Sequence, residues 1–85
     1  MMIFHESKYD GSYEDITPLV TSASWKTVRV GSPATLEISM LKHKAVQMGL
    51  GDILLLRDEK KGYFYGYVFR IKIDEKDELS ITAYD

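Results

Sequence analysis

Two apolar runs separated by a short charged connector dominate the sequence between Asp52 and Asp74. Ile53 to Leu56 and Tyr63 to Ile73 are rich in the β-branched and aromatic residues that favour a pleated, half-buried strand. The connector between them is charged and ends in glycine, which is typical of a turn. The stretch therefore predicts a β-hairpin, and the rest of the chain has to cover its apolar surface.

Further strands are predicted on both sides of this hairpin. Ile3 and Phe4 indicate a short first strand, and the polar segment from Ser7 to Asp15 predicts a surface loop. Leu19 to Val30 predicts one long strand without a helical period. Its apolar residues change parity at Lys26–Thr27, which predicts a bulge or a sharp bend there.

The remaining segments complete a β-rich pattern. Ala34 to Leu41 and Leu79 to Tyr84 alternate between apolar and polar residues, as half-buried strands do. His43 to Leu50 predicts a single helical turn, and Glu75 to Glu78 predicts a second charged turn. We therefore expect an all-β fold: a small split or closed antiparallel β-barrel of five to six strands with one short helical turn.

Length and composition limit the classes of protein to consider. Eighty-five residues form one small domain, and the absence of cysteine excludes disulfides and thiolate metal sites. The formal net charge of −2 gives no general attraction to nucleic-acid phosphates. No apolar run approaches the roughly 20 residues of a membrane-spanning helix, and the N-terminus does not have the pattern of a signal peptide. We expect a protein that is assembled in the cytosol and binds other proteins.

No residue pattern predicts catalysis, a metal or a cofactor. The two histidines, His5 and His43, are not in a metal-ligand spacing or beside a nucleophile motif. The glycines match no phosphate-binding fingerprint. The carboxylates lie mainly in turns and at alternate strand positions, where they keep a surface hydrated. We expect no catalytic residue, no metal site and no cofactor.

The second strand of the hairpin carries the one unusual composition. We expect its first parity to fill the core, with Tyr63, Tyr65, Tyr67, Phe69, Ile71 and Ile73. The second parity is charged from Arg70 onward but apolar before it, at Phe64, Gly66 and Val68, and Ile53 to Leu56 is apolar at both parities. Three explanations remain open for this end of the hairpin. A neighbouring segment such as Ala45 to Leu50 covers it, the strand register shifts through Gly66, or the apolar surface binds another subunit. The candidate interface consists of Ile53, Leu54, Leu55, Leu56, Phe64, Gly66, Val68 and Tyr84.

The same aromatic residues permit a different function. On a small barrel, exposed aromatic rings beside Lys60, Lys61, Arg70 and Lys72 could stack nucleic-acid bases, as oligonucleotide-binding folds do. The acidic net charge disfavours this hypothesis. A third possibility is an accessory domain of a cell-wall hydrolase.

Four segments occur in a characteristic order: DITPLVTSASW, LEISML, LGDILLLRDEKKGYFYGYVFRI and ITAYD. Their most specific parts are Gly51-Asp52 before an apolar run, Tyr65-Gly66 with Val68, and Thr82 to Asp85. The ordered set resembles the N-terminal domain of the XkdQ-like phage tail and baseplate hub proteins of prophages and phage-like contractile tail elements of Gram-positive bacteria.

This resemblance implies a non-enzymatic structural module. Residues 1–85 would be one barrel at the N-terminus of a larger hub protein, assembled in the cytoplasm and then carried in the tail particle. Its partners would be other hub subunits in a threefold ring, and the tail tube, spike and tape-measure proteins, with neither nucleic acid nor membrane. The isolated residues 1–85 are expected to be a monomer or a weak oligomer, because the ring would also need the rest of the hub protein.

Overall fold

One antiparallel sheet organises the computed structural model, which describes residues 1–26, 34–42, 48–60, 62–74 and 76–85. Within these residues the elements are β1 (Met2–Glu6), β2 (Tyr13–Asp15), the 3-10 turn η1 (Thr17–Leu19), β3 (Val20–Lys26), β4 (Thr35–Leu41), β5 (Ile53–Asp58), β6 (Gly62–Ile73) and β7 (Glu78–Tyr84). Their order in the sheet is β2-β1-β5-β6-β7-β4-β3.

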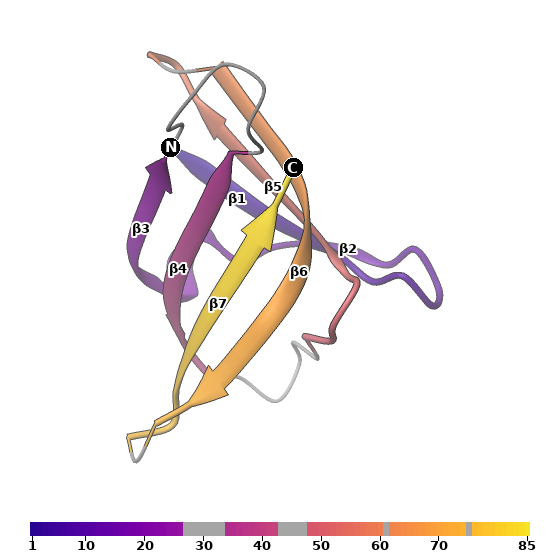
Figure 1. Ribbon diagram of the computed structural model, residues 1–85, viewed down its shortest axis with the longest axis vertical. Helices are drawn as coiled ribbons and strands as arrows, with labels where there is room; N and C mark the ends of the chain where they lie inside the picture. Colours follow the sequence, from indigo (N-terminus) through magenta and orange to yellow (C-terminus); the bar gives the residue numbers. More distant parts are fainter. Residues whose placement is uncertain (27–33, 43–47, 61, 75) are drawn as a thin grey trace.

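The sheet curls around a single core. In Figure 1, β4, β7 and β6 cross in front, and β1 and β5 pass behind them. The outermost strands, β2 and β3, share no ladder in the described part of the chain, so the sheet is split rather than closed. The predicted all-β antiparallel fold is confirmed, with more strands than the five to six expected.

Two differences concern short elements. β2 lies inside the segment from Ser7 to Asp15 that was predicted as a loop, and three residue pairs with β1 hold it. The helical turn of the described residues is η1, at the start of the predicted strand from Leu19 to Val30. A helical turn was predicted at His43 to Leu50, but residues 43–47 of this segment lie outside the described residues.

Aspartates begin the connectors of both long hairpins. Asp58 Oδ1 accepts the backbone amide of Lys60 at 2.8 Å. Asp74 Oδ1 accepts the amides of Lys76 and Glu78 at 2.8 and 2.9 Å. Such local bonds replace ladder bonds where a strand must end, which explains why both turns were evident from the sequence. The hairpin predicted between Asp52 and Asp74 is confirmed as β5 and β6.

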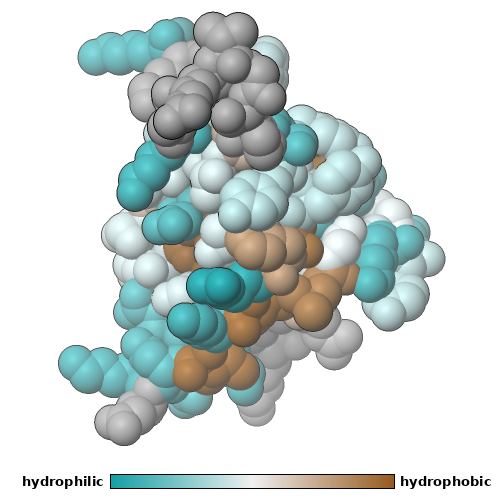
Figure 2. Space-filling model, in the orientation of Figure 1, coloured by the Kyte–Doolittle hydropathy of each residue, from teal (hydrophilic) through white to brown (hydrophobic). Residues whose placement is uncertain are grey.

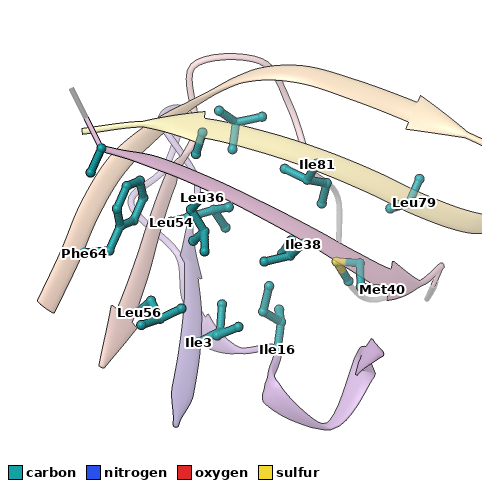
Figure 3. Packing of buried hydrophobic residues seen from close by; sticks show 13 residues of the cluster. Ile3, Ile16, Leu36, Ile38, Met40, Leu54, Leu56, Phe64, Leu79 and Ile81 are labelled. Atoms are coloured by element: carbon teal, nitrogen blue, oxygen red, sulfur yellow. The ribbon is translucent and has the colours of Figure 1, made fainter. Parts of the chain in front are cut away.

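The inner face of the sheet supplies the core (Figure 3). The buried hydrophobic residues are Ile3, Ile16, Ala34, Leu36, Ile38, Met40, Leu54, Leu56, Phe64, Val68, Leu79, Ile81 and Ala83. The alternating residues predicted for the inner faces of β4 and β7 are all among them. Each large side chain contributes about 1.5–3 kcal/mol through burial.

The predicted inner face of β6 is wrong at Tyr63, Tyr65, Tyr67, Phe69 and Ile73, which are all exposed, and of the predicted set only Ile71 packs against the core. Phe64 and Val68 are 2% exposed, whereas Tyr63, Tyr65 and Tyr67 are 71%, 49% and 53% exposed. The pairing of β6 with β7 shifts register between Val68 and Arg70. This irregularity changes the parity that faces the core, so Ile71 packs against the core while Tyr67 faces outward. Gly66, the predicted place for a shift, pairs in regular register with β5.

β3 also differs from its prediction. It begins at Val20, and its register with β4 shifts between Val20 and Ser22. Ala23 and Trp25 both pack against the core, so they share the inner face. The bend predicted at Lys26–Thr27 and the extension to Val30 concern residues beyond Lys26 that the structure does not describe.

Candidate functional site

The eight candidate interface residues lie on two opposite faces of the sheet. Five are buried on the inner face: Leu54, Leu56, Phe64, Gly66 and Val68. Ile53 and Leu55 are half-buried on the outer face of β5, and Tyr84 is exposed on the outer face of β7, with β6 between them. A partner can reach only Ile53, Leu55 and Tyr84 of this set. The candidate interface is therefore redefined as these three residues and the outward-facing residues around them.

These outer positions form a continuous surface across five strands. In register, Phe4 of β1 is opposite Leu55 of β5, which is opposite Tyr65 of β6. In the next row, Ile53 is opposite Tyr67, and Tyr67 is opposite Tyr84. We call this surface the outer aromatic face and define it by Phe4, Tyr13, Ile53, Leu55, Tyr65, Tyr67, Phe69 and Tyr84.

Ring contacts order the outer aromatic face. Phe69 and Tyr84 stack with ring centroids 4.1 Å apart and an interplanar angle of 11°. Tyr65 and Tyr67 meet edge to face at 6.1 Å. The Phe69 and Tyr84 rings come from neighbouring strands, β6 and β7, so their stacking also fixes the strands relative to each other. Hydrophobic surface also gathers along the lower half of β6 in the view of Figure 2.

Two guanidinium groups flank the aromatic rings of β6. The Arg57 guanidinium lies 5.7 Å from the Tyr63 ring centroid, and that of Arg70 lies 5.9 Å from the Phe69 ring centroid. Both distances are within cation–π range. Partial desolvation and the neighbouring Tyr67 and Glu6 raise the pKa of Tyr65 above its usual 10.0, so its hydroxyl stays neutral. The exposed aromatic segment of β6 therefore has a positive charge at each of its two ends.

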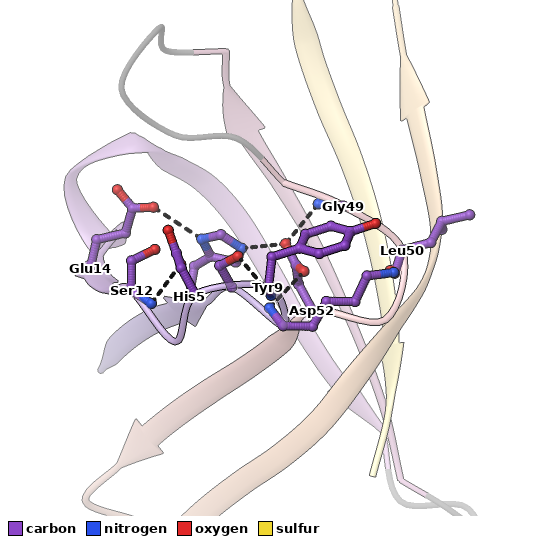
Figure 4. Close-up of polar contacts among 10 residues, drawn as sticks. His5, Tyr9, Ser12, Glu14, Gly49, Leu50 and Asp52 are labelled. Carbon is purple, nitrogen blue, oxygen red and sulfur yellow. Dashed lines mark hydrogen bonds and ion pairs between the residues drawn. The ribbon is translucent and has the colours of Figure 1, made fainter.

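A second site lies inside the molecule, at the base of the β1–β2 hairpin (Figure 4). His5 is 1% exposed and lies between two carboxylates. Its Nε2 is 2.7 Å from Asp52 Oδ2, and its Nδ1 is 3.1 Å from Glu14 Oε1. These contacts join β1, β2 and the residue that precedes β5. We call the three side chains the His5 cluster.

Backbone amides complete the surroundings of Asp52. Its Oδ1 accepts the Lys8 amide at 3.1 Å, and its Oδ2 accepts the Gly49 amide at 2.8 Å. Burial raises the pKa of Asp52, but the hydrogen bonds from His5, Lys8 and Gly49 and the charge of His5 outweigh it. The pKa of this carboxyl therefore lies below its usual 3.8.

The sequence did not single out this cluster, although both histidines were considered. His5 and Asp52 are 47 positions apart, and only the pairing of β1 with β5 brings them together. An Asp directly before an apolar run is visible in the sequence, but its burial is not. His43 lies outside the described residues. Within the described ranges, no group of three or more His, Cys, Asp or Glu side chains could hold a metal ion.

A family model matches residues 23–85 under the description YQBQ-like. The chain belongs to the YQBQ-like family. This family is found in phage-related proteins. The match includes β4 to β7, Asp52 and most of the outer aromatic face, and it begins after His5 and Glu14. A comparison with curated proteins found no match. Among the described residues, no helix has the length and apolar character needed to cross a membrane.

Proposed function

We propose that the chain is a non-catalytic structural module of a phage or phage-like tail, and that it forms part of the baseplate hub and tail-tube assembly. Membership of the YQBQ-like family supports the phage setting. The ordered segments that resemble XkdQ-like hub proteins support the finer assignment. The observation that carries the assembly role is the outer aromatic face, because exposed patches of large rings commonly mark protein–protein interfaces.

The outer aromatic face suits a protein partner in its chemistry as well. Tyrosine supplies a large contact area at a small cost in side-chain entropy. The stacked Phe69–Tyr84 pair is already ordered before a partner arrives, which lowers the cost of binding further. In the proposed assembly this face contacts another hub subunit or the neighbouring tube, spike or tape-measure protein.

A double substitution on this face tests the proposal. Tyr65→Ser with Tyr67→Ser removes two exposed rings, so we expect a loss of at most about 1.5 kcal/mol of stability. We expect incorporation into tail particles to fall at least about tenfold, because aromatic side chains often dominate interface energy. Quantitative mass spectrometry of purified particles from the producing strain measures incorporation.

Tyr9 offers a matched control. It is 86% exposed in the loop after β1 and is not part of the outer aromatic face. Tyr9→Ser should leave incorporation unchanged. Normal incorporation of the Tyr65/Tyr67 double variant would contradict the role of this face, and absence of the wild-type chain from every particle fraction would contradict the hub proposal itself.

Binding of single-stranded nucleic acid is a second candidate function. Tyr63, Tyr65, Tyr67 and Phe69 were expected in the core, whereas the structure exposes these rings between Arg57 and Arg70. Aromatic stacking combined with positive charge is the chemistry of such sites. The acidic net charge still opposes it.

A salt titration distinguishes the two candidates. Under the hub proposal, fluorescence anisotropy with a labelled oligodeoxynucleotide should show no saturable binding by the wild-type chain at 50–200 mM salt, the usual range for such tests. Salt-dependent binding that is lost in the Tyr65/Tyr67 double variant, and retained in Tyr9→Ser, would favour the second candidate instead.

A further inference from the structure

Three titratable side chains of the His5 cluster share two hydrogen bonds. Each bond needs one proton between a ring nitrogen of His5 and a carboxylate oxygen. Asp52 also accepts two backbone amides, so it acts as an acceptor and the His5 Nε2 donates to it. The bond to Glu14 therefore depends on a second proton, held between His5 Nδ1 and Glu14 Oε1.

Loss of that second proton leaves two acceptors facing each other. A neutral imidazole that donates through Nε2 presents a lone pair at Nδ1, and ionised Glu14 has no hydrogen to offer. Asp52 is 2% exposed and held by two amides, so it stays in place. The Glu14 side chain is 32% exposed and can turn into water. The bond to Glu14 is therefore the one that breaks.

The His5–Glu14 contact lies at the centre of the β1–β2 ladder. His5 and Glu14 form the middle of three residue pairs, between Phe4–Asp15 and Glu6–Tyr13. Beyond these pairs, the tip of the hairpin is closed by bonds between Ser7 and the backbone of Gly11 and Ser12. A three-residue strand with so few contacts loosens readily when its central side-chain bond is lost.

The elements packed around His5 supply the following charged groups. The loop after β1 contributes Lys8, whose ammonium donates to the Leu50 carbonyl and lies 5.0 Å from the Tyr9 ring. The segment before β5 contributes Asp52, and β2 contributes Glu14. Opposite His5, β5 contributes only the apolar Leu54. Of the two carboxylates that contact His5, only that of Glu14 can turn away from the ring into water.

We propose that the proton shared by His5 and Glu14 is a switch that fastens β2 to β1, and that its loss releases β2 and the tip of the hairpin. The switch acts on one end of the outer aromatic face, because Tyr13 of β2 stacks on Phe4 of β1 at 5.1 Å. Raising the pH frees Tyr13 from this stack, and lowering it restores the stack. All the residues of this switch belong to this chain, so the switch does not depend on which partner binds the outer aromatic face.

Hydrogen exchange across the His5 titration tests the switch in the 85-residue chain. The ring resonances of His5, assigned with the help of a His43→Gln variant, report its protonation. As the second proton leaves, we expect protection of the β2 amides, corrected for intrinsic exchange, to fall at least about tenfold, the equivalent of one charge-assisted hydrogen bond. Amides of β4 and β7 should not change.

Glu14→Gln is the decisive variant. A glutamine amide can accept from Nδ1–H and can also donate to a bare Nδ1, so it satisfies both protonation states of His5. We expect β2 to stay protected at every pH in this variant. Protection of β2 in the wild-type chain that ignores the His5 titration would overturn the proposal. So would an undiminished pH dependence in Glu14→Gln, or a His5 that keeps both protons until the whole chain unfolds.

Discussion

Replacing Asp52 with alanine will lower the free energy of unfolding by about 3–5 kcal/mol, the usual cost of removing one partner from a buried ion pair. The substitution leaves His5 Nε2 and the amides of Lys8 and Gly49 without their acceptor, at a position that is 2% exposed. Orphaned buried donors are more costly than the net value of the bonds themselves. Urea unfolding, followed through the fluorescence of Trp25, measures the loss.

Asp10→Ala is the matched control. Asp10 is exposed and accepts the Ser12 amide at 2.8 Å. Water replaces this bond when the side chain is lost, so the same substitution should cost less than about 1 kcal/mol. Equal losses at the two positions would contradict a structural role for the His5 cluster.

The low pKa of Asp52 makes the stability of the chain depend on pH. Because hydrogen bonds hold the pKa of Asp52 below 3.8, the folded chain releases this proton more readily than the unfolded chain does. Its contribution is therefore complete above the unfolded pKa and is lost as the pH falls below 3.8 through the folded pKa. Asp52→Asn should be less stable at neutral pH and should lose less stability than the wild-type chain on acidification.

The hairpin and the flanking strands could be predicted because local chemistry determines them. In β4 and β7 one face is apolar and the other polar, so a shift of one residue would expose the whole apolar set. The Asp and Gly residues of the connectors mark where each strand stops. β2 gave no such signal, since Tyr13–Asp15 is polar and is a strand only through its pairing with β1.

The orientation of β6 could not be predicted from alternation alone. Between Tyr63 and Phe69 both faces are apolar or aromatic, so neither parity stands out. Arg70 and Lys72 do mark an outer face, but the register shift between Val68 and Arg70 prevents its extension backwards. One cue was available, because tyrosine is buried less completely than phenylalanine or valine.

The His5 cluster could not be predicted either, for a different reason. Its hydrogen bonds join positions in three segments, and the energy that permits a buried Asp comes from backbone amides whose placement follows from the fold. Sequence spacing carries no trace of such an arrangement. The cluster became visible only when the β1–β5 and β1–β2 ladders were in place.

Replacing Gly66 with alanine will destabilise the chain by about 3 kcal/mol, at the upper end of the range for overpacked cores. A Cβ at this position would lie 2.5 Å from the Tyr84 carbonyl oxygen and 2.5 Å from Cζ of the Phe64 ring. The ring can rotate away at a cost, but the carbonyl belongs to β7, which pairs with β6 and β4 on its two sides. Urea unfolding again measures the change.

Gly49→Ala controls for the loss of glycine flexibility, because a Cβ there would meet its nearest atom, Asp52 Oδ2, at an ordinary 3.6 Å. It should cost less than about 1 kcal/mol. The comparison also tests the orientation of β6. If Tyr63, Tyr65 and Tyr67 filled the core, Gly66 would face outward, where a methyl group meets only solvent, and Gly66→Ala would be harmless. A stable Gly66→Ala variant would therefore contradict both the burial of Phe64 and the exposure of the outer aromatic face on which the proposed interface depends.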